Sequence, residues 1–109
     1  MFIKVCALDE IANDECRSLS FKGADYFVVR KEQGIFGFEN RCPHLGTSLE
    51  FVPNQFLNID KSLVQCSMHG ALFTIDDGLC ISGPCEGQQL TLKPVKIEAG
   101  HVWLEHQND

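Results

Sequence analysis

The chain has 109 residues, with 9 Lys and Arg against 15 Asp and Glu, and its formal net charge is -6 at pH 7. This length suits a single domain, residues 1–109, and leaves no room for a second catalytic module. The negative charge repels phosphate backbones and no basic cluster interrupts it, so nucleic acid is excluded as a partner. An acidic surface suits either solubility or attraction of a basic protein partner.

The first ten residues alternate apolar and polar side chains and reach Asp9 and Glu10 without the apolar run of a signal peptide. No stretch has the length of a membrane span. We therefore expect a soluble, cytoplasmic protein with no membrane partner, whose six cysteines stay reduced unless a metal or catalysis recruits them. Three disulfides of a secreted domain are the alternative that an even number of cysteines leaves open.

Short strand-like runs separated by turn signals follow one another along the chain, and no segment keeps a helical period. The first strands are expected at residues 2–8, 16–21, 25–31 and 34–40. The segment 49–60 is irregular, because Pro53 and Asn54 favour a loop or one short helical turn.

Strand character resumes at residues 62–67, 70–75 and 79–82, and Asp76-Asp77-Gly78 is a strong hairpin signal between the last two. Residues 89–105 predict two further strands joined across Ala99 and Gly100. The pattern predicts an all-β fold with a small antiparallel base that resembles a sandwich or a barrel. A second lobe, at about residues 41–86, is expected to be inserted into this base.

A cysteine and a histidine lie close together twice, as Cys42 with His44 and as Cys66 with His69. Two such pairs, each in a loop between strands, argue against surface histidines beside buried thiols. A structural zinc site also accepts two thiolates and two imidazoles, but zinc modules more often pair cysteine with cysteine and histidine with histidine along the chain. Here each segment supplies one of each. A Rieske-type 2Fe-2S centre needs this mixture, since two cysteines hold one iron and two histidines the other.

The segments CPHLGTSL, residues 42–49, and CSMHGALF, residues 66–73, resemble the two cluster-binding boxes of the Rieske ferredoxin family. Residues 76–104 resemble the family's closing segment, with a proline loop at residues 82–84 over the cluster and a final hairpin. The resemblance implies the Rieske fold and one 2Fe-2S cluster per chain.

Residue by residue, the resemblance implies that Cys42 and Cys66 bind the buried iron and that His44 and His69 bind the exposed one. The two histidines would then bring the cluster nearest to solvent. An almost uncharged rim is expected around them, formed by Pro43, Leu45, Met68, Gly83 and Pro84.

The chain departs from the high-potential members of the family in the boxes themselves. Where those proteins carry two extra cysteines that form a disulfide, this chain has Thr47 and Met68, and where they carry a serine and a tyrosine, it has Ala71 and Phe73. Hydrogen bonds to sulfur stabilise the reduced cluster, so their absence predicts a low potential. The loop at residues 53–62 is also longer than in compact oxygenase ferredoxins.

The resemblance implies a one-electron carrier that takes an electron from a flavin-dependent or ferredoxin reductase and passes it to a terminal oxygenase or another redox acceptor. It would catalyse no substrate chemistry itself. Two alternatives remain open: the small subunit of an assimilatory nitrite reductase, which shares this fold but often lacks the ligands, and a zinc-stapled interaction module.

The remaining singled-out residues have structural interpretations. Cys80 and Cys85 are predicted to be two free thiols, with a redox-active pair as the alternative. His101 and His106 are predicted to be solvated histidines of the final hairpin. The residues expected in the core are Cys6, Cys16, Phe21, Phe27, Phe36, Phe38, Phe51, Phe56 and Phe73, with Trp103 closing the last strand.

Overall fold

The computed structural model describes residues 1–32, 34–43, 49, 54–66 and 70–106. The elements in this part of the chain are β1 (Phe2–Ala7), the 3-10 turn η1 (Leu8–Glu10), β2 (Glu15–Phe21), β3 (Ala24–Lys31), β4 (Gly34–Glu39), β5 (Leu63–Gln65), β6 (Leu72–Thr74), β7 (Cys80–Ser82), β8 (Leu92–Lys93), β9 (Val95–Glu98) and β10 (His101–Glu105). The predicted all-β fold is confirmed. Over the same residues, no helix is long and apolar enough to cross a membrane.

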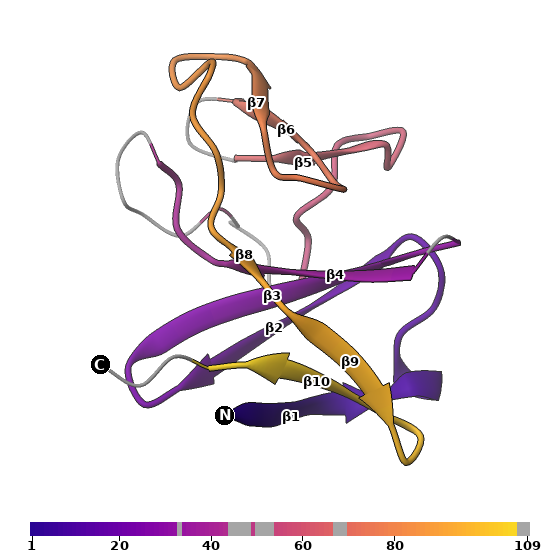
Figure 1. Ribbon diagram of the computed structural model, residues 1–109. Coiled ribbons are helices and arrows are strands. Elements are labelled where there is room, and N and C mark those ends of the chain that lie inside the picture. The colour runs from indigo at the N-terminus through magenta and orange to yellow at the C-terminus, as the bar shows by residue number, and fades with distance from the viewer. Residues whose placement is uncertain (33, 44–48, 50–53, 67–69, 107–109) are drawn as a thin grey trace.

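The strands form three antiparallel sheets, with the orders β1-β10-β9, β2-β3-β4-β8 and β5-β6-β7. The first two sheets make up the base, and the third forms an upper lobe that the chain enters after β4 and leaves before β8 (Figure 1). The predicted architecture, a β base with an inserted lobe, is therefore confirmed.

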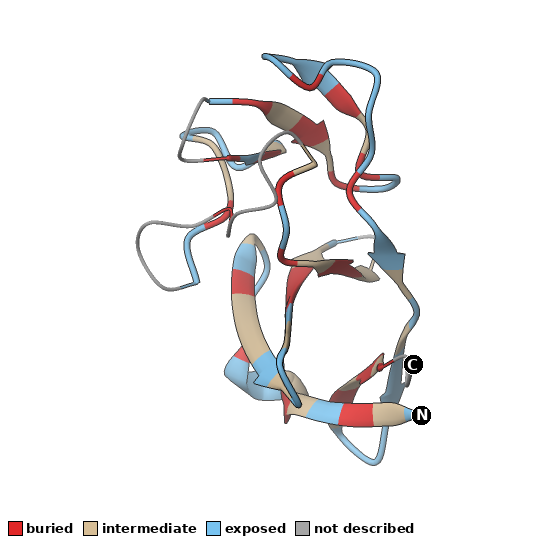
Figure 2. Cartoon of the chain, turned by 90° about the vertical axis from the view of Figure 1, so that its left-hand side faces the viewer, coloured by how far each residue is buried: buried red, intermediate tan, exposed pale blue. Residues whose placement is uncertain are grey.

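Strand β3 is buried on both of its faces, as Tyr26, Phe27, Val28 and Val29 are at most 3% exposed. Alternate residues of a strand point to opposite faces. Tyr26 and Val28 belong to a core cluster inside the base, whereas Phe27 and Val29 belong to a second cluster that continues into the lobe. The sheet that contains β3 is therefore the middle layer, and buried segments occur both in the base and in the lobe above it (Figure 2).

One of two neighbouring ring stacks joins the base to the lobe, and the other lies within the base sheet. The ring of Phe56, which lies in the segment before β5, is almost parallel to that of Phe27, with centroids 4.0 Å apart. Phe27 also stacks on Phe38 of β4, with centroids 5.2 Å apart. All three side chains are fully buried, as predicted for them, while Phe51 lies outside the described residues.

The segment 89–105 corrects one sequence-based expectation. The strand expected before the final hairpin is divided at Pro94: β8 pairs with β4, and β9 pairs with β10 in the other sheet of the base. Proline has no N–H for a strand ladder, although its carbonyl still accepts a hydrogen bond, here from Glu105 N at 2.9 Å. The chain therefore changes sheets at Pro94, and the predicted hairpin across Ala99 and Gly100 is confirmed.

His106 was predicted to be solvated and is instead buried. Its Nδ1 lies 2.7 Å from the hydroxyl of Tyr26, and its backbone N–H donates to Met1 O at 2.7 Å. The ring also makes edge contacts with Phe21 and Tyr26. The polar atoms of a buried histidine need partners, and here Tyr26 and Met1 provide them. His106 therefore ties the two ends of the described chain to the base.

Replacing Phe56 with alanine is expected to remove about 3–5 kcal/mol from the free energy of unfolding, since a buried ring leaves a cavity at the junction of lobe and base. Phe2→Ala is the matched control, because Phe2 is only partly buried. Lys96 Nζ lies over its ring, 4.5 Å from the ring centroid. It should cost about 1 kcal/mol. Urea unfolding followed by fluorescence measures both, and equal losses would show that the stack does not join the two parts.

Candidate metal centre

The first cysteine-bearing segment leaves the end of β4. Cys42 is 1% exposed, and Asn40, two residues earlier in the sequence, is also buried. Asn40 N donates to Asp25 O at 2.8 Å, and its Oδ1 accepts a hydrogen bond from Leu49 N at 2.9 Å. Asn40 thus ties the two ends of the segment to each other and to β3. His44 and Leu45 lie outside the described residues.

The positioning role of Asn40 was not predicted from the sequence. Asparagine directly after a strand is a known turn former, because its side chain bonds nearby backbone groups, and this was the available signal. The partner of its side chain, however, is nine positions further along, beyond the range of a local turn. Only the folded chain identifies it.

The second cysteine-bearing segment connects β5 to β6. Cys66 is fully buried, its N–H donates to Ala71 O at 2.9 Å, and its carbonyl accepts from Gly70 N at 2.9 Å. These bonds close a tight loop on the cysteine backbone. His69 and Met68 fall within residues 67–69, which the structure does not describe.

The expected proline loop packs on this second segment. Gly83 has a φ of +106°, and a Cβ atom built on it would lie 2.8 Å from the Cα of Ala71. Only glycine tolerates both this backbone conformation and this close approach. Ser82, Gly83 and Pro84 are exposed, as expected for the two rim residues among them, Gly83 and Pro84.

Cys42 and Cys66 belong to one core cluster although they come from two different loops. Thiolates buried in apolar surroundings need a compensating positive charge, and soft sulfur donors select iron–sulfur clusters, zinc or copper(I). The donor set is therefore suited to an iron–sulfur cluster. Among the described residues, no three His, Cys, Asp or Glu side chains gather as a metal site, so neither His101 nor His106 completes one with these cysteines.

The side chains expected to lower the potential are partly described. Ala71 and Phe73 are completely buried in this core, and neither side chain has a hydroxyl group to donate. Thr47 lies outside the described residues, as Met68 does.

Cys80 and Cys85 belong to the same core cluster as Cys42 and Cys66. The Cys85 thiol donates to the Cys80 sulfur at 3.0 Å, and the Cys80 thiol donates to Ser82 O at 3.3 Å. Burial, followed by the contact with Cys80, raises the pKa of the Cys85 thiol above its ordinary value. Both are thiols without a disulfide here, as predicted.

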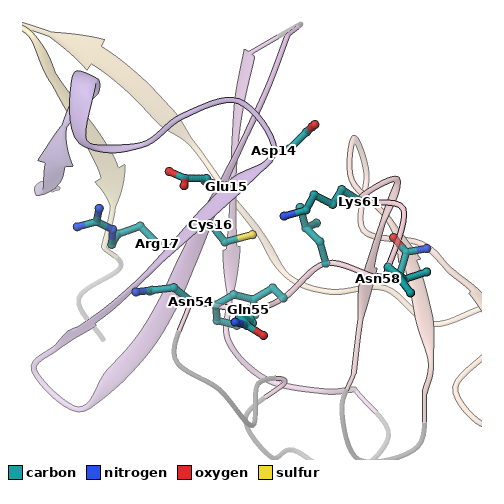
Figure 3. A pocket seen from close by; sticks show the side chains of 11 residues that line it. Asp14, Glu15, Cys16, Arg17, Asn54, Gln55, Asn58 and Lys61 are labelled. Atoms are coloured by element: carbon teal, nitrogen blue, oxygen red, sulfur yellow. The ribbon is translucent and has the colours of Figure 1, made fainter.

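A hollow on the flank of the molecule lies between β2 and residues 54–61 (Figure 3). Its charged side chains have mixed signs, since Asp14 and Glu15 lie near Arg17 and Lys61. Among the described residues that line it there is no histidine, and Cys16 is the only cysteine. This hollow therefore lacks the ligands expected of the metal centre.

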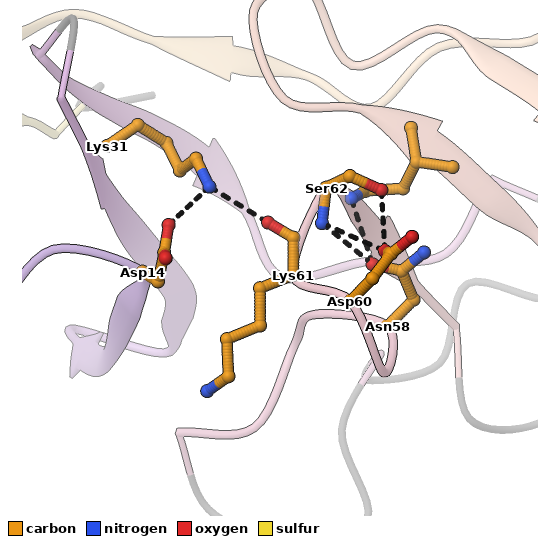
Figure 4. A network of polar contacts seen from close by, with 7 residues as sticks. Asp14, Lys31, Asn58, Asp60, Lys61 and Ser62 are labelled. Carbon is orange, nitrogen blue, oxygen red and sulfur yellow. Dashed lines mark hydrogen bonds and ion pairs between the residues drawn. The ribbon is translucent and has the colours of Figure 1, made fainter.

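The same segment is tethered to the base at two points. Asn54 Oδ1 accepts from Ser18 N at 2.7 Å, and the Lys31 ammonium group contacts both the Asp14 carboxylate and Lys61 O (Figure 4). Asn58 and Asp60 close the turn on the backbone of Ser62. The long loop between the two boxes is therefore fixed to the base over the part that the structure describes.

Residues 1–97 match the family model described as the Rieske [2Fe-2S] domain. The chain belongs to this family. The predicted resemblance and the predicted 2Fe-2S cluster are thereby confirmed, and the Rieske assignment takes the place of the zinc alternative.

Individual Rieske relatives match the chain over most of its length. The ferredoxin subunit of biphenyl dioxygenase from Pseudomonas sp. (strain KKS102) is 27% identical over 105 residues, which cover 95% of this chain and 91% of that protein. A structure of the complex of reduced oxygenase and oxidised ferredoxin in carbazole 1,9a-dioxygenase matches with a TM-score of 0.79 and 26% identity, over 94% of this chain and 91% of that one.

The ferredoxin of carbazole 1,9a-dioxygenase from Nocardioides aromaticivorans IC177 has the same fold, with a TM-score of 0.80 at 17% identity. The match covers 98% of this chain and 99% of that one. The Rieske fold thus extends over the base and the lobe together.

Gly83→Ala is expected to destabilise the Rieske lobe, since its Cβ would meet the backbone of Ala71, which cannot yield. Gly87→Ala is the control, because Gly87 also has a positive φ, +90°, but no atom lies within 4 Å of its Cβ position. The first substitution should cost about 1–3 kcal/mol more than the second. Denaturant unfolding and the rate of cluster loss measure the difference, and equal values would refute the contact.

Proposed function

We propose that this chain is the ferredoxin component of an oxygenase system, which carries one electron at a time from a reductase to a terminal oxygenase. The observation that carries the proposal is the match to ferredoxin components of dioxygenases over nearly the whole length of both chains. Such a carrier needs a cluster near the surface and no substrate pocket of its own. Residues 1–109 act as one Rieske domain in this proposal.

Cys42, His44, Cys66 and His69 hold the cluster in this proposal, with the cysteines on the inner iron and the histidines on the outer one. The burial of both cysteines in one core cluster supports this assignment. The cluster supplies the one-electron redox chemistry when bound. The protein residues set the position of the two loops: Asn40 holds the ends of the first, and Ala71 and Gly70 close the second on Cys66.

The protein acts in the cytoplasm in this proposal. None of its six cysteines is in a disulfide, which suits a reducing compartment. The net charge of -6 suits electrostatic steering toward basic partners, one a flavin-dependent or ferredoxin reductase and the other the oxygenase.

Metal analysis tests the ligand assignment. The intact protein should contain two irons and two acid-labile sulfides, as the Rieske [2Fe-2S] domain implies. Cys42→Ser and Cys66→Ser should each abolish stable assembly, because each removes a strong bond and a balancing charge. Cys6→Ser is the control, since Cys6 is buried in the core cluster of the base.

The histidine variants test the outer iron. His44→Cys or His69→Cys should keep a cluster with a lower potential, owing to the added negative charge. An unchanged absorption spectrum in both variants would exclude the histidines as ligands. One zinc and no sulfide in the intact protein would refute the carrier function.

The midpoint potential should lie at the low end of the Rieske range, roughly -150 mV. The reason is that Ala71 and Phe73 offer no hydroxyl to the buried sulfur side of the site. Voltammetry of the intact protein measures the value, and Ala71→Ser together with Phe73→Tyr should raise it. A potential above zero in the unaltered protein would mean that backbone donors replace the missing hydroxyls.

Electron transfer is expected through the exposed rim of the lobe. Ile81, which is 46% exposed, lies two residues before Gly83, and Ile97, which is 53% exposed, lies on β9 of the base and serves as the control. Ile81→Glu should slow transfer to the oxygenase at least severalfold, because it buries a charge in the contact, whereas Ile97→Glu should not. Stopped-flow kinetics measures both. Equal rates would place the contact on another face.

A further inference from the structure

Two buried thiols lie side by side in the upper lobe, outside the proposed ligand set. Cys80 begins β7 and Cys85 follows the proline loop, and their exposed fractions are 2% and 1%. Their sulfurs are 3.0 Å apart, about 1 Å more than the disulfide bond length of about 2.05 Å. A small rotation of both side chains is enough to bring the sulfurs into bonding distance.

The backbone around the pair is already fixed. Cys80 N donates to Gln88 O at 2.8 Å, Gly87 N donates to Cys80 O at 3.0 Å, and Gln88 N donates to Cys85 O at 2.9 Å. Both cysteines are therefore held by a closed turn before any bond forms between them. A disulfide would need no large movement of the chain, which is the condition under which such bonds form without strain.

We propose that Cys80 and Cys85 are a reversible dithiol–disulfide pair, which hydrogen peroxide oxidises and a small dithiol reduces. In the first step one thiol gives a sulfenic acid and a water molecule. The second thiol then attacks the sulfenic sulfur, the S–S bond forms, and a second water leaves. The pair loses two electrons and two protons, and one peroxide becomes two waters.

Burial decides which oxidant acts. Because both sulfurs are almost completely covered, a bulky disulfide cannot align with either of them, whereas peroxide is small enough to enter. The pair is therefore oxidised by peroxide and not by bulky disulfides, and a small dithiol reduces it.

The disulfide would restrain the loop that covers the second Rieske box. The loop between the two cysteines contains Gly83, which packs on Ala71, and Ala71 O accepts the hydrogen bond from Cys66 N. Closing the ring at Cys80 and Cys85 fixes this contact from the outer side. The inference does not depend on the identity of the electron acceptor.

The experiment maps the bond in the cluster-loaded protein after peroxide treatment. Cleavage after acidic residues releases the peptide 78–86, GLCISGPCE, which contains these two cysteines and no other. We expect this peptide to lose the mass of two hydrogens and to resist alkylation until dithiothreitol is added. Alkylated thiols or sulfinic acids in this peptide, once the cluster has bleached, would overturn the proposal.

A second measurement tests the restraint on the loop. Oxidation should raise the unfolding temperature of the wild-type protein by several degrees, and dithiothreitol should reverse the rise. Cys85→Ala should lose the effect, whereas Cys6→Ala, the same change at a buried cysteine of the base, should keep it. An equal rise in Cys85→Ala, or no rise in the wild type, would overturn the restraint.

Discussion

The burial of β3 on both faces is the constraint on which the rest of the structure depends. A sheet with one apolar face needs one covering layer, but the four central residues of β3 leave no face for solvent. The sheet β1-β10-β9 covers one side, and the lobe covers the other. The lobe thus covers the hydrophobic core and also contains the two ligand boxes. The same contacts therefore stabilise the site and the fold.

The described residues of the lobe form little regular structure, and their order comes from contacts with the base. Its sheet consists of three strands of three residues each. Strands this short stabilise one another weakly. The Phe27 and Phe56 stack, the Asn54 side chain and the Lys31 ammonium group connect the lobe to the central sheet instead. Short strands with long-range anchors let loops occupy most of the lobe, which is what a site built from loops requires.

Much of the fold was predictable because its signals are local. The alternating and continuous apolar runs predicted the strands. The spacing of cysteine and histidine predicted the cluster, and the resemblance of residues 42–49 and 66–73 to the Rieske boxes predicted the family. The run Tyr-Phe-Val-Val at residues 26–29 also indicated that β3 is buried on both faces. A strand covered on one face alternates apolar and polar residues, and this run is apolar throughout. Pro94 likewise was the sequence signal for the change of sheet, because proline interrupts a strand ladder.

What could not be predicted depends on the path of the folded chain and not on a local sequence pattern. The burial of His106 follows from a tyrosine 80 positions earlier, and the contact between Cys80 and Cys85 follows from the path of the turn that joins them. The role of Asn40 likewise follows from the position of Leu49 in the folded chain. No pattern of hydrophobicity or spacing encodes such pairs, because each arises only after the layers have packed.

The Asn40 bond to Leu49 gives the first box a property that bears on its evolution. Since one side chain holds the two ends of the segment together, the residues between them other than the proposed ligands Cys42 and His44 can change in number or kind without moving β4 or the lobe beyond. Loop-closure entropy grows only slowly with loop length, by about 0.6 kcal/mol for each doubling. The non-ligand residues of this segment can therefore vary to suit a new redox partner, while the strands that support the segment stay in place.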